Sequence, residues 1–235
     1  MANASEHAWL ALLGPPAAGK TTITAAVCDG GGIAAFRLRD FALACRTYGW
    51  LPGDEFDRRD DLGWLTATTV ASVLRVAFTE RRFGRYGPVI FDNFPGSADQ
   101  LHLLHDISVA CGARLGILEL TADNTELCRR AIERRVCAQC EPDPLSDPHR
   151  PAHRSPDHPQ QCMTCSGPLS QRPSDEPSVF RTRLDRYRAR IPAIHAAAAA
   201  LRLPLCQVDT QADARIVRQL AAAAVEVLGL TRLSP

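Results

Sequence analysis

Gly-Pro-Pro-Ala-Ala-Gly-Lys-Thr, residues 14–21, fits the pattern G-x-x-x-x-G-K-[ST] of a phosphate-binding loop. The apolar run Ala8–Leu13 precedes it and is predicted to be a buried parallel strand, and Thr21–Val27 follows it as a predicted helix. This order of strand, loop and helix is the setting that such a loop requires. A chance turn rich in glycine and alanine is the alternative. Lys20 counts against it, because it is the only lysine among 27 basic residues and a compact ammonium group suits phosphate oxygens.

The loop predicts how a nucleoside triphosphate binds. Backbone N–H groups of the loop and of the first helical turn would surround the phosphates. The Lys20 side chain would reach the β- and γ-phosphates, and the Thr21 hydroxyl would bind Mg²⁺. The predicted contacts to the donor phosphates are Gly14, Ala17, Ala18, Gly19, Lys20, Thr21 and Thr22.

The composition is that of an ordinary globular protein. With 235 residues, of which 46% are hydrophobic and 23% charged, the chain is expected to form one domain with room for an inserted subdomain. The net charge of +1 gives no reason to expect a nucleic acid or an anionic membrane as partner. No apolar run approaches the roughly 20 residues of a membrane span, and no basic region precedes the first apolar run as in a signal peptide. We therefore expect a cytoplasmic protein with no membrane or nucleic-acid partner.

Apolar runs alternate with helical patterns along the rest of the chain. Besides Ala8–Leu13, strands are predicted at Ile33–Phe36, Val89–Asp92, Leu115–Leu120 and Leu205–Val208. Helices are predicted up to Cys45 and over residues 66–82, 100–111, 124–135, 177–190, 194–201 and 212–228. Strands that alternate with helices predict an α/β fold, with a parallel sheet covered by helices on both faces.

Asp92 ends the predicted strand Val89–Asp92. A carboxylate at this place after a phosphate-binding loop is the usual second acid of the Mg²⁺ site. The alternative is a surface aspartate without a role in catalysis.

Arginines gather at the end of the predicted helix 124–135, where they are Arg129, Arg130, Arg134 and Arg135. One explanation is that the helix dipole favours cations at a helix C-terminus. The other is that these side chains face the phosphates of a triphosphate. A second arginine-rich helix is the one predicted over residues 177–190.

Four of the nine cysteines form two C-x-x-C pairs, Cys137 with Cys140 and Cys162 with Cys165. Four thiolates in two tight pairs match the tetrahedral preference of Zn²⁺, and a site with four protein ligands is structural. The residues between the pairs carry no evident hydrophobic core, so a metal would order them. Two redox dithiols are the alternative to a metal site. Alternative ligands between the pairs are His149, His153 and His158.

The order of these motifs resembles that of the adenylate kinase family over nearly the whole chain. Asp40 stands twenty residues past Lys20, where the family has the Asp of its monophosphate-binding segment. Residues 92–95, Asp-Asn-Phe-Pro, with Gln100 beyond, resemble the family's Asp-Gly-Phe-Pro-Arg segment and its base-reading glutamine. The cysteine pairs resemble the zinc-bearing lid of many bacterial members. Gln-Arg-Pro-Ser-Asp at 171–175 and Arg-Thr-Arg-Leu at 181–184 resemble the lid exit and its arginine helix.

The resemblance implies a P-loop NTPase fold with three layers and an inserted zinc-binding lid. The core would comprise residues 1–136 and 171–235, with an acceptor-binding segment at 37–82, and the lid would comprise residues 137–170. The implied activity is ATP-dependent phosphoryl transfer to a nucleoside monophosphate or a similar small acceptor. The implied ligands are ATP, Mg²⁺ and Zn²⁺, and we expect a monomer.

The resemblance also implies a role for each matching residue. Arg130 would stack on the donor adenine, and Asp92 would act on Mg²⁺ through water. The residues expected to act on the transferring phosphoryl group are Lys20, Asp92, Arg134, Arg172 and Arg183. The expected acceptor contacts are Arg37, Arg39, Asp40, Leu65 and Gln100.

Two departures from the family pattern concern the acceptor. The family has an arginine three residues after the Asp that matches Asp40 and another directly after Phe-Pro, where this chain has Leu43 and Gly96. Both arginines normally hold the phosphate of the acceptor, so we expect AMP to be a poor acceptor unless Arg37 or Arg39 substitutes.

Two alternatives follow for the function. One is a kinase of the same fold that acts on a different small acceptor, which Leu43 and Gly96 favour. The other is a nucleotide-binding module without catalysis, which the presence of Lys20, Asp92, Arg172 and Arg183 disfavours.

Overall fold

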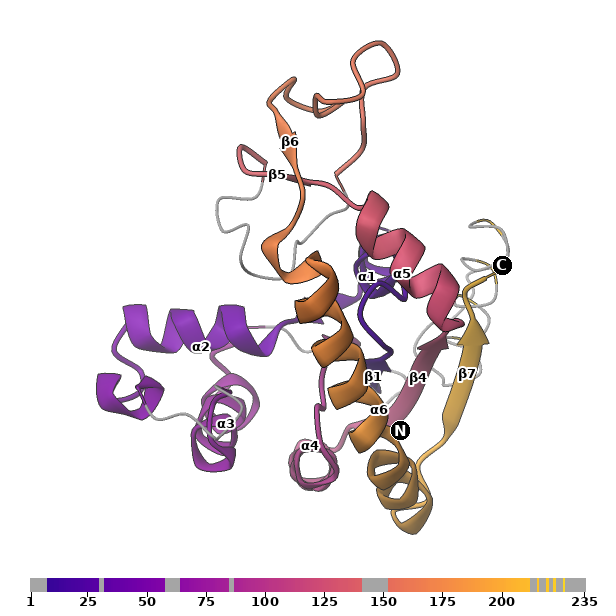
Figure 1. The fold of residues 1–235 in the computed structure, drawn as a ribbon. Helices are drawn as coiled ribbons and strands as arrows, with labels where there is room; N and C mark the ends of the chain where they lie inside the picture. The colour runs from indigo at the N-terminus through magenta and orange to yellow at the C-terminus, as the bar shows by residue number, and fades with distance from the viewer. Residues whose placement is uncertain are drawn as a thin grey trace.

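A parallel five-stranded sheet forms the centre of the computed structural model (Figure 1). The structure describes residues 8–29, 32–57, 64–84, 87–140 and 152–211, together with Arg215, Gln219, Ala222 and Glu226. The strand order is β2-β3-β1-β4-β7, and every neighbouring pair is parallel. The strands are β1 (Ala8–Leu13), β2 (Ala34–Phe36), β3 (Val89–Asp92), β4 (Arg114–Thr121) and β7 (Leu205–Asp209). The predicted α/β fold with a parallel sheet is confirmed.

Helices connect these strands, and side-chain oxygens cap several of them. The helices are α1 (Lys20–Asp29), α2 (Leu38–Thr47), α3 (Ala67–Leu74), α4 (Ala98–Ala110), α5 (Asn124–Glu133) and α6 (Pro177–Ala200). Short turns of other helical types are η1 (Gly53–Phe56), η2 (Arg75–Thr79) and η3 (Pro173–Asp175). The capping residues are Thr66 before α3, Ser97 before α4, Asp123 before α5 and Glu176 before α6. Each accepts a hydrogen bond from a backbone N–H of the first turn, which would otherwise lack a partner.

Side chains of β1 alternate between two helical layers, because successive residues of a strand point to opposite faces of the sheet. Leu10 and Leu12 pack in a core with buried residues of α1, α5 and the first half of α6. Trp9 and Leu13 pack in a second core with residues of α2, α3, α4 and the second half of α6. All six residues of β1 are buried, as expected for a strand between two layers. The sheet and its two helical layers are the three-layer arrangement that the sequence predicts.

Two parts of the chain project from this core (Figure 1). One contains α2 and α3. The other contains the antiparallel strands β5 (Val136–Cys137) and β6 (Leu169–Ser170). Cys137 lies in β5, and the other three cysteines of the two pairs lie between these strands in the sequence. The core of this second projection is small and consists of Cys137, Cys162 and Leu169, with Ala152 packed against them.

Helix α6 differs from the prediction, which ended one helix at Arg190 and began another at Ile194. The structure has one helix with Pro192 inside it, so the predicted break is wrong. A proline removes a helical hydrogen bond and disfavours helix in the residue before it. Ile194, Ala197 and Ala198 are nevertheless buried against the second core, and this burial keeps the chain helical past the proline.

Two other predicted helices also end differently. The helix predicted over residues 66–82 is α3 followed by the π-helical turn η2. The helix predicted over residues 212–228 lies largely outside the described residues, although Arg215, Gln219, Ala222 and Glu226 are helical. Among the described residues, the helices are all too short or too polar to cross a membrane.

Candidate active site

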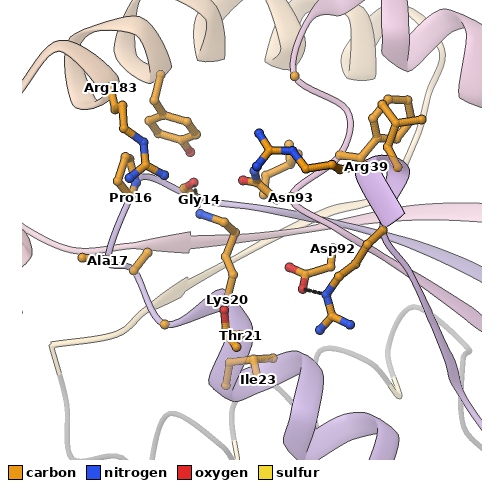
Figure 2. Close-up of a pocket in the computed structure, with 18 of the residues that line it drawn as sticks. Gly14, Pro16, Ala17, Lys20, Thr21, Ile23, Arg39, Asp92, Asn93 and Arg183 are labelled. Atoms are coloured by element: carbon orange, nitrogen blue, oxygen red, sulfur yellow. Dashed lines mark hydrogen bonds and ion pairs between the residues drawn. The ribbon is translucent and has the colours of Figure 1, made fainter. Parts of the chain in front are cut away.

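A cavity of about 1260 Å³ lies where β1 and β3 end. Its walls come from the phosphate-binding loop, α1, α2, α5 and α6. Figure 2 shows Lys20, Arg39, Asp92 and Arg183 turned toward it from different segments of the chain. All the predicted donor and acceptor contacts line this cavity, as do Asp92, Arg130, Arg134 and Arg183. Arg172 is not among the lining residues; its side chain is buried next to them, with 3% of the residue exposed.

The phosphate-binding loop has the conformation that its sequence requires. Lys20 Nζ donates hydrogen bonds to the carbonyl oxygens of Gly14, at 2.7 Å, and of Pro15, at 2.9 Å. At Gly14, which has φ +151°, a Cβ atom would lie 3.0 Å from the carbonyl oxygen of Leu120, so a larger residue would displace the loop from β4. Ala17 has φ 65°, the left-handed conformation that costs a non-glycine residue about 1–2 kcal/mol. The loop therefore holds a strained residue at its centre, as functional sites often do.

Asp92, the predicted Mg²⁺ acid, is engaged with an arginine. The residue is 8% exposed, and its Oδ2 accepts a hydrogen bond from Nε of Arg37 at 3.0 Å. Figure 2 marks this interaction of Asp92 with a dashed line. Asp92 and the Thr21 hydroxyl both border the cavity and both offer the oxygen donors that Mg²⁺ prefers, so the two residues fit this ion. The pairing also means that Arg37 already has an anionic partner.

Asp175 organises two of the predicted catalytic arginines, and sequence reasoning missed it. Its side chain is fully buried, and Arg134 donates to both of its carboxylate oxygens, with Nε to Oδ2 at 2.6 Å. Arg183 Nη1 lies 3.8 Å from Asp175 Oδ1 and donates to the carbonyl oxygen of Ser174 at 3.2 Å. One buried carboxylate thus fixes arginines from the end of α5 and from α6 at the same wall of the cavity. The signal for this role was the position of Asp175 in the predicted lid exit.

Arg130, the residue predicted to contact the donor base, is held on two sides. Its Nε donates to Glu126 Oε1 at 2.6 Å, and its Nη1 donates to the Thr210 hydroxyl at 3.0 Å. Arg129 also donates to Glu126, at 2.7 Å. Hydrogen bonds from Arg129 and then Arg130 lower the pKa of Glu126 to about 2, so this carboxylate is charged at neutral pH. Glu126 and Thr210 were not predicted, although the four-residue spacing of Glu126 and Arg130 on one helix was a readable signal.

The acceptor side of the cavity combines apolar and polar side chains. Leu43, Leu65 and Trp64 line it together with Arg39 and Gln100. Oε1 of Gln100 accepts a hydrogen bond from the backbone N–H of Gly96 at 2.7 Å, which fixes the side chain predicted to read a base. Trp64 and Arg190 border the same region and were not predicted.

The four cysteines of the C-x-x-C pairs meet at one place. Their Sγ atoms all lie within 4.8 Å of one another, with Cys137 and Cys165 at 3.4 Å and Cys140 and Cys162 at 3.8 Å. Four sulfurs bound tetrahedrally at the usual Zn–S distance would be about 3.8 Å apart, so the cluster fits Zn²⁺. Backbone N–H groups of Cys165 and Thr164 lower the pKa of Cys162 to about 6, which favours the thiolate that a metal binds. The described cysteines form no disulfide, and the two C-x-x-C pairs meet in one cluster of four thiols.

Comparison with known proteins agrees with this geometry. No protein-family model matches the chain. It is 31% identical over 188 residues to the adenylate kinase of Sphingopyxis alaskensis, a match that spans 78% of this chain and 82% of that protein. The chain belongs to the adenylate kinase family. Adenylate kinases of Salinispora tropica and Rhizorhabdus wittichii are 30% and 28% identical to it, over 76% and 78% of this chain and 80% and 83% of theirs.

Membership of the adenylate kinase family confirms two of the sequence predictions. The cavity belongs to a nucleotide kinase, and the four-cysteine cluster lies where a zinc-type lid was predicted. The phosphate-binding loop and the cysteine cluster are thus both consistent with an adenylate kinase. The roles of individual residues stay predictions.

Proposed function

We propose that this protein transfers the γ-phosphoryl group of ATP to a nucleoside monophosphate. The observation that carries the proposal is the arrangement across the cavity. Lys20 and the loop line the cavity, and Arg134 and Arg183, both held by Asp175, line it from the end of α5 and from α6. A phosphoryl group in this cavity would meet cationic groups from three segments of the chain.

Phosphoryl transfer needs positioning and charge neutralisation more than covalent chemistry from the protein. Lys20 would hold the β- and γ-phosphates, while Arg134 and Arg183 would neutralise the charge that spreads over the transferring group. Arg172 is placed to support them from its buried position near the lid exit. Arg130, fixed by Glu126 and Thr210, would lie against the donor base. Because their partners hold these arginines in place before substrate binds, little reorganisation is needed during the reaction.

Thr21 and Asp92 would hold Mg²⁺, which neutralises phosphate charge and orients the leaving group when bound. Arg37 occupies one oxygen of Asp92, so the carboxylate would reach the ion through water or through its other oxygen. The Arg37–Asp92 pair also makes Arg37 the weaker of the two candidates for replacing the family's acceptor arginines.

The lid would exclude water from the transferring group. We place it at residues 137–170, because β5 and β6 close its base and the four cysteines order its interior. Arg154 Nη2 donates to the carbonyl oxygen of Glu133 at 2.9 Å and connects the lid to the end of α5, next to Arg134. Movement of the lid would therefore reach the catalytic arginines directly and limit hydrolysis of ATP. We also propose a cytoplasmic monomer that binds neither membranes nor nucleic acids.

A second candidate function is phosphoryl transfer from ATP to a small acceptor other than AMP. Leu43 is 64% exposed on α2 and occupies the position at which the family has an acceptor arginine. With an apolar side chain there, the acceptor phosphate must be held by other groups or the acceptor must differ.

The experiment that separates these functions measures ADP formation from ATP with a panel of acceptors. The panel contains AMP, the other nucleoside monophosphates, nucleosides and phosphorylated small metabolites. Turnover of AMP or another monophosphate supports the proposed function. Turnover confined to a non-nucleotide acceptor supports the second candidate, and no turnover with any acceptor contradicts both.

A further inference from the structure

The space in front of Gly96 is filled by an indole. A Cβ atom at this position would lie 2.9 Å from Cζ3 of Trp64 and 3.3 Å from Oε1 of Gln100. Contacts below 3.0 Å do not occur without movement of the neighbour, so an arginine at position 96 and the present position of Trp64 exclude each other. The departure from the family pattern at Gly96 therefore goes with the present position of Trp64.

The guanidinium group of Arg190 lies over the same indole ring. Cζ of Arg190, on α6, lies 4.0 Å from the centre of the Trp64 ring, which is a close cation–π contact. Nη1 of Arg190 is shielded from solvent and has no hydrogen-bond partner among the described residues. Arg190 lines the cavity. Trp64, which precedes α3, thus holds this arginine of α6 beside Gly96, with donor capacity left for a ligand.

Helix α2 offers a second arginine to the cavity, Arg39. Arg37 is paired with Asp92 at 3.0 Å, and Arg46 lies 3.5 Å from Asp57. Arg39 has no ion pair with any residue in the described ranges, and Figure 2 shows its guanidinium extending into the cavity above Asp92. It stands one helical turn before Leu43, on the same face of α2.

We infer that Arg39 and Arg190 bind the phosphate of the acceptor, and that Trp64 positions Arg190 for this task. This inference rests on the proposed function and deepens it. The two arginines that relatives supply from positions 43 and 96 are replaced here by cations from one turn earlier on α2 and from α6. The acceptor class is a phosphate monoester, because two guanidinium groups, one from α2 and one from α6, match a doubly charged terminal phosphate. AMP then stays a substrate in spite of Leu43 and Gly96.

The binding of AMP and of adenosine to the zinc-loaded protein, measured by calorimetry, tests this inference. Arg190→Ala is expected to weaken AMP binding by about 10- to 100-fold, the value of one or two charge-assisted hydrogen bonds. Binding of adenosine, which lacks the phosphate, and of ATP is expected to stay unchanged. Arg188→Ala is the matched control, because Arg188 lies on the same helix, is 44% exposed and pairs with Asp185. Arg190→Lys is expected to retain part of the affinity, because lysine keeps the charge but not the fork of donors.

Steady-state kinetics distinguishes a role of Arg190 in phosphate binding from a purely structural role, because a structural role would not change the KM for AMP alone. In Arg190→Ala the KM for AMP is expected to rise while kcat and the KM for ATP hold. Trp64→Ala is expected to raise the KM for AMP as well, because Arg190 loses its support. A triple variant that combines Arg190→Ala, Trp64→Ala and Gly96→Arg returns an arginine to this part of the acceptor site. It is expected to recover part of the lost affinity for AMP.

Three outcomes overturn the inference: equal AMP affinity in wild type and Arg190→Ala, an equal loss for AMP and adenosine, or no binding of AMP by the wild type. A different outcome separates the two proposals. If AMP binds in an Arg190-dependent way but no phosphoryl transfer occurs, the proposed function fails while the phosphate site stands.

Discussion

Asp175 is the residue on which the geometry of two predicted catalytic arginines depends. Asp175→Asn keeps its shape but removes the charge that Arg134 and Arg183 share. Because breaking a buried ion pair leaves cations without compensation, and both arginines are partly exposed, the free energy of unfolding is expected to fall by about 2–3 kcal/mol. Urea denaturation measures this loss, and kcat is expected to fall with it.

The control for Asp175 is Asp185→Asn, an exposed acid of α6 that pairs with Arg188 at 3.5 Å. Its effect on stability is expected to stay within about 0.5 kcal/mol. Equal stabilities of the Asp175 and Asp185 variants would show that Asp175 does not organise the site.

Glu126 gives the protein a pH dependence whose sign is fixed by its arginines. Hydrogen bonds from Arg129 and Arg130 lower its pKa from 4.5 to about 2, so the folded state binds this proton more weakly than the unfolded state does. The stabilisation is therefore fully present above pH 4.5 and is lost as the pH falls toward 2. In Glu126→Gln this part of the pH dependence is expected to disappear. Thermal midpoints of both proteins between pH 2 and 6 measure it, and parallel curves would contradict the prediction.

Some residue-level features were readable from sequence and others were not. The phosphate-binding loop and the Glu126–Arg130 pair are both local sequence patterns. The loop was predicted from its spacing, and the pair could have been predicted from its four-residue spacing on one helix. The Arg37–Asp92 pair joins residues 55 positions apart, and no local pattern indicates it. The left-handed conformation of Ala17 was also not predictable, because the loop imposes it on a residue that does not favour it.

The lid is the element whose order we expect to depend on a metal. Its described core holds two cysteines and one leucine, too few to offset the conformational entropy of the loops around them. We expect about one zinc ion per chain in the purified protein. Chelation or Cys162→Ser is expected to lower the thermal midpoint and to speed amide hydrogen exchange first within residues 152–170.

Cys128→Ser is the matched control for the lid, because Cys128 is an exposed thiol on α5 outside the cluster. It is expected to leave zinc content and hydrogen exchange unchanged. Purified protein without a bound transition metal would count against the zinc site.

At the level of elements, periodicity located the strands well and the helix ends less well. Every strand of the central sheet was predicted, because buried parallel strands are short apolar runs between turns. The break predicted near Pro192 was wrong, since tertiary burial of Ile194 and its neighbours overrides the local preference of proline. The antiparallel pair β5–β6 was not predicted, because two-residue strands give no periodic signal.

At the scale of the whole molecule, the sequence identified the donor half of the site more completely than the acceptor half. The donor half is built around one contiguous loop, whereas the acceptor half combines α2, the start of α3, Gly96 and α6. Trp64 and Arg190 are 126 positions apart and meet only through the tertiary fold. The departure at Gly96 can be noticed in the sequence, whereas the arginine inferred to compensate for it can be found only in the three-dimensional structure.

The central claim is that one cavity binds ATP through Lys20 and passes its γ-phosphoryl group to a monophosphate. The most direct test is ADP production from ATP and AMP by the wild type and by Lys20→Ala. The wild type is expected to convert one ATP and one AMP to two ADP. Lys20→Ala is expected to stay folded and to lose about 100- to 1,000-fold in kcat, as when one preorganised electrostatic group is removed. Near wild-type turnover by a folded Lys20→Ala, or the absence of ADP formation by the wild type with any monophosphate, would contradict the claim.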